Sequence, residues 1–232
     1  MSGSNAVLAT ARFEYLFWDM VYRRESCPVS PDRQGGRAMK RLLQPWTTAE
    51  ILVVATMGIA IGLVWVPWTW FYQGTAAVLG PWAAHFVGGF WLIGGVITPY
   101  IVRKPGAALL GELIAALAEM PLTPWGAIVL IAGLIEGGAC ELFFLATGYR
   151  RFSLPWLMGA AAFGGLAFSL LYLYPIQGWG RLAIEAQVLY TLMRMAGAAI
   201  LAGGGAKLIA DALVPTGVLD AFPIARERRP EI

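Results

Sequence analysis

Long apolar runs alternate along the chain with short stretches rich in proline, glycine and charged residues. Most runs approach or exceed the about 20 residues that a helix needs to cross a bilayer, so the pattern predicts an all-α membrane protein, a six-helix bundle. Residues 66–82, with two prolines, two glycines and many aromatics, predict a long, partly helical loop at the membrane interface. The expected helices cover residues 47–66, 85–102, 105–120, 124–149, 154–174 and 186–213.

Lysine and arginine indicate the direction in which these helices cross. The loops after the first and third expected helices contain no Lys or Arg, and the loop after the fifth contains only Arg181. Six crossings place all other basic clusters on one side, which predicts cytoplasmic termini, whereas a seventh crossing within residues 74–102 would scatter them. The clusters are Arg37, Lys40 and Arg41; Arg103 and Lys104; Arg150 and Arg151; and Arg226, Arg228 and Arg229.

The composition supports this interpretation. Charged residues make up 13% of the 232 residues, against roughly 25% in soluble domains. No Asp, Glu, Lys or Arg occurs in residues 51–102. The net charge of +3 comes mostly from residues near the ends of apolar segments, so it is a topology signal rather than a sign of nucleic-acid binding.

The first 45 residues differ in kind from the rest. Within them, the stretch RRESCPVSPDRQGGRAMKR is polar and rich in helix breakers, so we expect a flexible extension. The preceding FEYLFWDMVYRR could form a short amphipathic helix at the membrane interface. Met39 would also serve as a start, and we expect residues 1–38 to be dispensable or to precede the true start. The expected parts are an extension over 1–45, a membrane domain over 46–219 and a cytoplasmic tail over 220–232.

Acidic side chains inside the apolar runs are the strongest functional signal. Lipid cannot solvate a carboxylate, so such residues usually face a cavity or a basic partner. Glu112 lies in the middle of its expected helix, while Glu119 is near the outer end and would reach water. Glu136 and Glu141 are five residues apart, about 140° around a helix, so they point in different directions. Arg194 is the obvious partner for one acid in a structural ion pair.

Aromatic residues crowd the outer half of the expected bundle. Most fit the interfacial belt, but Trp91 lies deeper. Together with the acids they predict a cavity for a flat, cationic, heteroaromatic ligand, whose rings would stack and whose charge a carboxylate would balance. His85 is the single histidine and is expected to pack or to anchor a loop rather than to bind a metal, so cobalt uptake is a weak interpretation.

The sequence contains no protease or nucleotide-binding motif of the types H-E-x-x-H, G-x-S-x-G or G-x-x-x-x-G-K. We therefore expect no catalytic residue, no cofactor and no metal site, and ATP hydrolysis would have to come from another protein. Small residues let helices approach closely. Gly58 and Gly62 are expected either to pack inside the bundle or to face a partner helix.

Three stretches carry a family resemblance: YIVRKPGAALLGELIAAL, LIEGGACELFFLATGYRRF and AKLIADALVPTGVL. They resemble the S components of energy-coupling factor (ECF) transporters, in particular the YkoE-type subfamily linked to thiamine and hydroxymethylpyrimidine, and the likeness extends over residues 47–219. The resemblance implies six helices with both termini inside, in the plasma membrane of a prokaryote. It also implies an outward-facing site covered by the loop between the first two helices. The implied partners are a membrane coupling subunit and two cytoplasmic ATPases.

The resemblance also suggests which residues bind. Glu112 and Glu141 are the first candidates because they lie within the matching stretches, and Glu136 is next. Small residues of the first helix would contact the coupling subunit, and Ala55, Gly58 and Gly62 are the candidates. Wall or lid candidates, chosen by position and chemistry, are Trp91, Tyr100, His85, Trp68, Tyr174 and Tyr190.

Two hypotheses about function follow. The first is a subunit that captures thiamine, its hydroxymethylpyrimidine precursor or a related breakdown product. The second is a stand-alone proton- or ion-coupled carrier of a small cationic metabolite, whose acids would relay protons. The lack of visible inverted repeats and of clearly broken helices argues against the second hypothesis. A membrane enzyme is least favoured, because no nucleophile–base or metal constellation is present.

Overall fold

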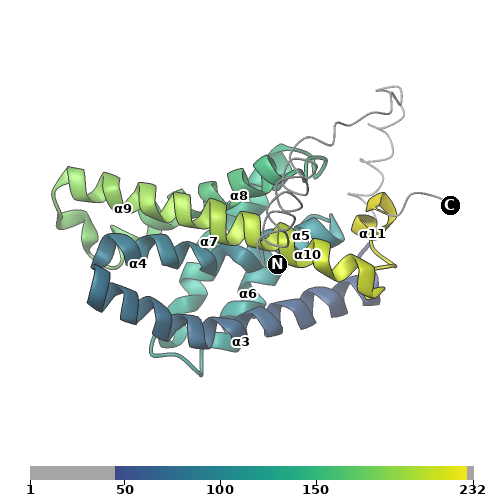
Figure 1. Cartoon of the computed structure of the whole chain (residues 1–232), viewed down its shortest axis with the longest axis horizontal. Coiled ribbons are helices and arrows are strands. Elements are labelled where there is room, and N and C mark those ends of the chain that lie inside the picture. Colours follow the sequence, from purple (N-terminus) through teal and green to yellow (C-terminus); the bar gives the residue numbers. More distant parts are fainter. Residues whose placement is uncertain (1–44, 229–232) are drawn as a thin grey trace, which may run out of the picture. The chain divides into compact units, whose positions relative to one another are not determined.

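The computed structural model describes residues 45–228, and every regular element in this range is helical. Two π-helical turns, Ser169–Leu173 and Ala198–Gly204, extend α8 and join α9 to α10. Expectations about residues 1–44 fall outside the described range. The helices are α3 (Thr48–Leu79), α4 (Pro81–Gly88), α5 (Ile93–Val102), α6 (Ala107–Glu119), α7 (Val129–Ala146), α8 (Leu154–Phe168), α9 (Ile184–Gly197), α10 (Gly205–Leu213) and α11 (Pro223–Arg228) (Figure 1).

Within the described residues, five helical segments are long and apolar enough to cross a membrane. The prediction of an all-helical membrane protein is therefore confirmed. α6, with 13 residues, is shorter and packs against α3, α5 and α7. Six crossings and cytoplasmic termini stay predictions. The five segments are Thr48–Leu79, Pro81–Val102, Gly126–Ala146, Leu154–Leu173 and Ile184–Thr216.

α3 continues through the stretch that was expected to be a loop, so that prediction is wrong. Pro67 lies inside the helix, where a proline removes one backbone hydrogen bond. The aromatic-rich part that suggested an interfacial loop instead packs, with Trp65 and Thr69 buried, in a helix that contacts α4 and α6. Gly80 alone joins α3 to α4, and its φ of +88° suits a residue without a side chain. The first two helices therefore have no long loop between them.

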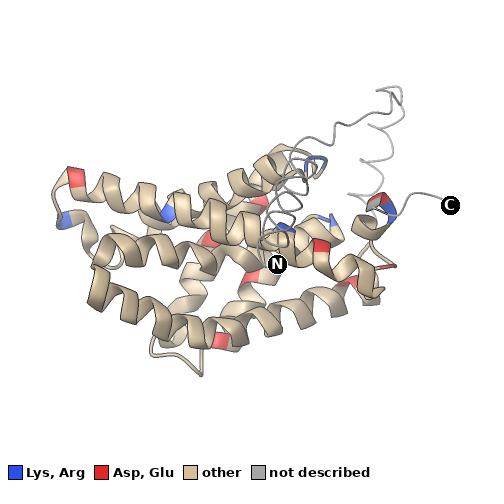
Figure 2. Cartoon of the chain, viewed as in Figure 1, with Lys and Arg blue, Asp and Glu red and all other residues tan. Residues whose placement is uncertain are grey.

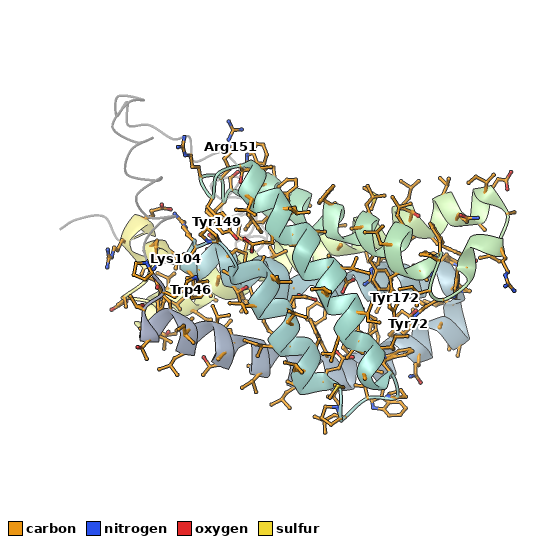
Figure 3. All side chains as sticks on the ribbon, turned by 180° about the vertical axis from the view of Figure 1, so that it is seen from behind. Trp46, Tyr72, Lys104, Tyr149, Arg151 and Tyr172 are labelled. Atoms are coloured by element: carbon orange, nitrogen blue, oxygen red, sulfur yellow. The ribbon has the colours of Figure 1, made fainter. Side chains whose placement is uncertain are left out.

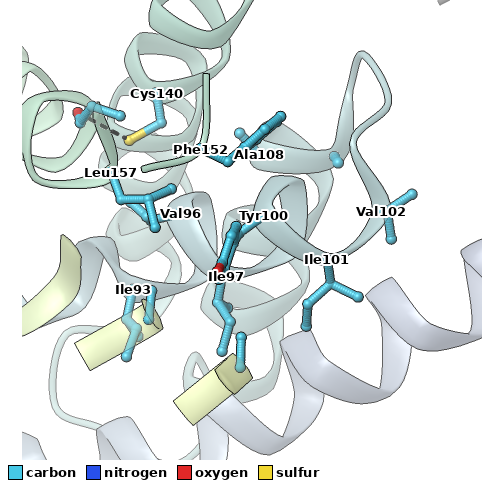
Figure 4. Close-up of a cluster of buried hydrophobic side chains, with 14 of the residues drawn as sticks. Ile93, Val96, Ile97, Tyr100, Ile101, Val102, Ala108, Cys140, Phe152 and Leu157 are labelled. Atoms are coloured by element: carbon cyan, nitrogen blue, oxygen red, sulfur yellow. Dashed lines mark hydrogen bonds between the residues drawn. The ribbon is translucent and has the colours of Figure 1, made fainter. Parts of the chain in front are cut away.

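α5 forms the centre of the bundle. All of its residues are buried, and it contacts α3, α6, α7, α8, α10 and α11. Figure 4 shows Ile93, Ile97 and Ile101 along one side of this helix, with Leu157 of α8 close to Val96. A helix that is apolar all round is stable only when other elements cover every face. α5 is therefore the scaffold on which the other helices are positioned.

Glycines allow α3 and α6 to approach closely. A Cβ on Gly58 would lie 2.8 Å from the Cβ of Ile114, and one on Gly62 would lie 2.3 Å from the carbonyl oxygen of Ala115. Both glycines are buried in this contact, whereas Ala55 is half-buried. The surface expected to meet a partner helix is thus largely occupied by α6 of the same chain.

Basic residues gather where the α5–α6 turn, the start of α8 and α11 lie (Figure 2). Here Lys104 pairs with Glu50 at 2.7 Å, and Arg103 pairs with Glu227 of α11. α11, which lies in the expected cytoplasmic tail, packs against α5. We call this region the basic end of the bundle; its basic residues are Arg103, Lys104, Arg150, Arg151 and Arg226.

Candidate functional site

A cavity lies between α3, α4, α6, α7, α8 and α9, away from the basic end. Its empty space, including solvent at its mouth, is about 700 Å³. Figure 3 shows Tyr72 and Tyr172, both cavity residues, far from Lys104 and Arg151 at the basic end. The lining consists of Trp65, Tyr72, His85, Trp91, Glu112, Ala116, Glu119, Trp125, Val129, Ala132, Gly133, Glu136, Phe168, Tyr172, Leu173, Gln177 and Arg194.

Three acids line this cavity. Glu112 and Glu119 lie on α6, seven residues apart and so on one face of the helix, and Glu136 lies on α7. They are 1%, 2% and 3% exposed, respectively. α6 and α7 come close because Gly137 has no side chain; a Cβ there would lie 2.8 Å from the Cβ of Glu112. The fold thus concentrates three carboxyl groups around one hollow.

Glu136 has a basic partner within the cavity. Arg194 of α9 donates a hydrogen bond through Nη2 to Glu136 Oε1, and both side chains are almost fully buried. The Cζ atom of Arg194 also lies 4.0 Å from the centroid of the Phe168 ring. In residues 45–228, Glu112 and Glu119 form no ion pair. One of the three acids is therefore balanced by the protein and two are not.

Glu112 is held in place from α5. Its Oε2 accepts a hydrogen bond from the N–H of Gly95 at 2.5 Å. Gly95 lies in the first turn of α5, directly after the 3-10 turn Gly89–Leu92. Gly94 permits the contact because a Cβ at this position would lie 2.8 Å from the same oxygen. The start of α5 therefore fixes one oxygen of Glu112 and leaves the other available.

Several polar atoms of the cavity residues lack a partner. The buried atoms without a geometrically good hydrogen bond to the described part of the chain are Glu112 Oε1, Trp65 Nε1, Trp91 Nε1, His85 Nε2 and Arg194 Nε. Buried polar atoms in proteins are nearly always hydrogen bonded. Because these five residues line a single cavity, they indicate that a ligand or water supplies the missing donors and acceptors.

Three aromatic rings form one wall. The ring centroids of Tyr72 and Trp91 are 5.0 Å apart, and Trp125 lies 6.1 Å from Tyr72 and 6.4 Å from Trp91. All three contacts are edge-on, the arrangement that aromatic pairs favour. Trp125 is fixed from the α6–α7 turn by a hydrogen bond from its Nε1 to Thr69 Oγ1 at 3.3 Å. We call Tyr72, Trp91 and Trp125 the aromatic trio.

Glu141 of α7 does not line the cavity; its side chain lies at the N-terminus of α6. Its carboxylate accepts hydrogen bonds from the N–H groups of Gly106 at 2.7 Å and Ala108 at 3.1 Å, and from the hydroxyl of Tyr149 at 2.5 Å. Burial and then the nearby carboxylate raise the pKa of Tyr149 above its ordinary value, so its hydroxyl remains a donor. A carboxylate here satisfies free N–H groups and the helix dipole. The structure thus separates Glu141 from Glu112 and Glu136.

Of the aromatic residues and His85 that were predicted to form the wall or lid, some line the cavity and others do not. His85 and Trp91 line the cavity, and Tyr190 stands behind His85 with ring centroids 4.9 Å apart. Tyr174 donates to the carbonyl of Gln187 at 2.5 Å, outside the lining.

Two further candidates are engaged elsewhere. Trp68 donates to the carbonyl oxygen of Val87 at 3.2 Å. Tyr100 donates to Asp211 at 2.8 Å and accepts from Lys207 at 3.3 Å, both on α10. Neither side chain lines the cavity.

Sequence reasoning missed several lining residues. Trp65 and Tyr72 are seven residues apart and share a helix face, but residues 66–82 were expected to be a loop, so the helical period was not applied there. Glu119 was expected to reach water and is instead buried. Gln177, in the α8–α9 loop, carries no sequence signal that could have found it.

Comparisons with known proteins agree with this architecture. The family described as "ABC-type cobalt transport system, permease component" matches residues 49–167. Among residues 45–228, no group of three His, Cys, Asp or Glu side chains is arranged to hold a metal ion.

A relative and a solved structure cover most of the chain. The "Putative HMP/thiamine permease protein YkoE" of Bacillus subtilis (strain 168) is 34% identical over 186 residues, 80% of this chain and 93% of that protein. The solved structure "Crystal structure of an S-component of ECF transporter" matches with a TM-score of 0.75 and 34% identity, over 79% of this chain and 93% of the other. The chain is therefore a transport subunit rather than an enzyme, and a multi-pass protein of a prokaryotic plasma membrane. It belongs to the S components of energy-coupling factor transporters.

Proposed function

We propose that the chain captures thiamine or its hydroxymethylpyrimidine part in the cavity, from the outer side of the membrane. It then passes the ligand on through a membrane coupling subunit driven by two cytoplasmic ATPases. The relative named an HMP/thiamine permease and the S-component structure support the substrate and the partners. The basic end is cytoplasmic by the positive-inside rule, and the cavity lies away from it.

One observation carries the proposal: Glu112, buried in the lining of a cavity that aromatic rings also line, has an oxygen without a partner in the described residues. An ionised carboxylate in such a place is costly unless a donor or cation meets it. An aminopyrimidine ring has an amino donor beside ring nitrogens that accept. It would donate to Glu112 Oε1 and accept from the indole N–H of Trp65 or the Nε–H of Arg194. The ligand thus supplies what the lining lacks.

The test is equilibrium binding of radiolabelled thiamine and hydroxymethylpyrimidine to the purified protein. The variant Glu112→Gln keeps the shape but removes the charge, and we expect roughly tenfold or greater loss of affinity, as for a hydrogen bond to a charged group. Glu185→Gln is the matched control, because Glu185 is an exposed acid of α9 outside the cavity. It should bind like the unaltered protein. Failure of the unaltered protein to bind either compound would overturn the proposal.

A second assay addresses transport. Liposomes that contain this chain alone should show no concentrative uptake under a proton or sodium gradient, and uptake should appear when the coupling subunit and ATPases are added with ATP. Gradient-driven uptake by the chain alone would instead favour a stand-alone carrier whose three acids relay protons.

A further inference from the structure

We propose that Glu119, beside the aromatic trio, is the residue that distinguishes a ligand with a permanent positive charge from the neutral pyrimidine alone. The inference rests on the proposed function and deepens it: the cavity has two subsites, and only the second one selects for charge. Thiamine, with a pyrimidine and a cationic thiazolium ring, would fill both, whereas hydroxymethylpyrimidine would fill the first.

The two unbalanced acids are separated along one helix. Glu112 and Glu119 are seven residues apart on α6, which corresponds to about 10 Å along the axis. Glu112 is held at the start of α5, inside the bundle, whereas Glu119 is the last residue of α6, beside the turn that carries Trp125. A single pyrimidine ring is shorter than this separation. Two rings joined by a methylene bridge can reach from one acid toward the other.

The surroundings of the two acids differ. Glu112 has a fixed N–H contact and an oxygen that requires a donor, which suits a neutral amino group. Glu119 lines the same cavity as the aromatic trio, and its carboxyl interacts with the side chain of Trp91. The trio offers ring surfaces whose centroids lie within 6.4 Å of one another. Aromatic faces attract cations, and quaternary nitrogens in particular bind among such rings. The Glu119 subsite therefore suits a delocalised cation that has no proton to donate.

No Lys or Arg of the described residues forms an ion pair with Glu119. Arg194, the one Lys or Arg that lines the cavity in this part of the chain, is held by Glu136 and by the face of Phe168. Its Cζ atom also lies 6.0 Å from the centroid of the Trp91 ring, so one ring of the trio is partly engaged by a cation of the protein. The hydroxyl of Thr123 lies 3.4 Å from Glu119 Oε1, which is a neutral contact at the limit of hydrogen bonding. A cationic ring in the ligand would supply the missing positive charge. A neutral ring would leave Glu119 as it is in the empty cavity.

The experiment compares two variants with two ligands. Thiamine and hydroxymethylpyrimidine are titrated into the full chain and into Glu119→Gln and Glu112→Gln. We expect Glu119→Gln to lose roughly tenfold or more in affinity for thiamine and to bind hydroxymethylpyrimidine within about twofold of the unaltered protein. Glu112→Gln should weaken both ligands. Equal weakening of both ligands by Glu119→Gln, or no weakening of either, would overturn the two-subsite arrangement.

Two controls separate the possible failures. If Glu119→Gln does not fold, Trp125→Leu replaces it, since loss of one ring of the trio should also weaken thiamine while sparing the pyrimidine. Equal effects on both ligands would count against the inference. If the unaltered protein binds neither compound, the proposed function itself fails. If it binds both and only the variant pattern differs from expectation, the proposed function stands and the role of Glu119 is wrong.

Discussion

At the scale of single residues, Glu136 and Glu141 on α7 have different surroundings although they are only five positions apart. Glu136 faces the cavity and Arg194, while Glu141 accepts three hydrogen bonds at the start of α6. The rotation of about 140° between them follows from helix geometry alone. It places one acid in the proposed binding site and the other in the framework that positions Glu112.

Replacement of Glu141 tests this division. Glu141→Gln removes the charge at the α6 N-terminus and turns an amide donor toward groups that also donate. We expect a loss of about 2 kcal/mol of folding free energy, typical of hydrogen bonds to a charged group. The measurement is thermal unfolding in detergent. At temperatures where the variant is folded, thiamine affinity should match that of the unaltered protein, and a loss of affinity without a loss of stability would place Glu141 in the site.

The sequence could show that these acids point apart, but not which one meets a ligand. The partners of Glu141 include Gly106, which is 35 residues away in the chain, so the contact depends on how α6 and α7 pack. Likewise, the ion pair of Arg194 with Glu136 spans 58 positions. Apolar periodicity predicts which residues are inside the membrane. The pairing of polar groups inside it is a tertiary property.

At the scale of helices, α3 shows where pattern reasoning failed. Proline and clustered aromatics in residues 66–82 suggested a loop, because both are frequent at helix ends and membrane interfaces. The helix nevertheless continues, since contacts with α4 and α6 outweigh local preferences. The ranges of the other long helices were close to those observed, because their apolar runs end at clear breakers such as Gly106, Gly148 and Gly178. The stretch that was expected to be a loop over the site is therefore helical, and Tyr72 was not recognised as a cavity residue.

Close contacts between helices give a prediction at this scale. A Cβ on Gly197 of α9 would lie 1.8 Å from the carbonyl oxygen of Phe86 in α4, whereas a Cβ on Gly138 of α7 would meet nothing within 4 Å. We expect Gly197→Ala to destabilise the protein by roughly 1–3 kcal/mol, as overpacking does. Gly138→Ala should be neutral or stabilising by up to about 1 kcal/mol through helix propensity. The measurement is thermal unfolding of both variants in detergent. Equal changes in the unfolding temperature of the two variants would contradict the described packing of α9 against α4.

At the scale of the whole molecule, the orientation in the membrane is open to a direct test. In a background with Cys27 and Cys140 replaced by serine, single cysteines are introduced as Glu185→Cys and Arg151→Cys, both at exposed positions. The basic end should face the cytoplasm. On intact cells, a membrane-impermeant maleimide should therefore label position 185, and position 151 only after permeabilisation. The opposite labelling would place the mouth of the cavity on the inner side.

The length of α3 has a consequence for the surrounding lipid. Its 32 residues correspond to about 48 Å, while the hydrocarbon layer of a bilayer is about 30 Å thick. Apolar side chains near its far end, among them Trp70, Val78 and Leu79, are exposed on the protein surface. Such hydrophobic mismatch is relieved when the helix inclines or when the bilayer thickens around it. The angle at which this subunit stands should therefore respond to acyl-chain length, with short-chain lipids inclining it further.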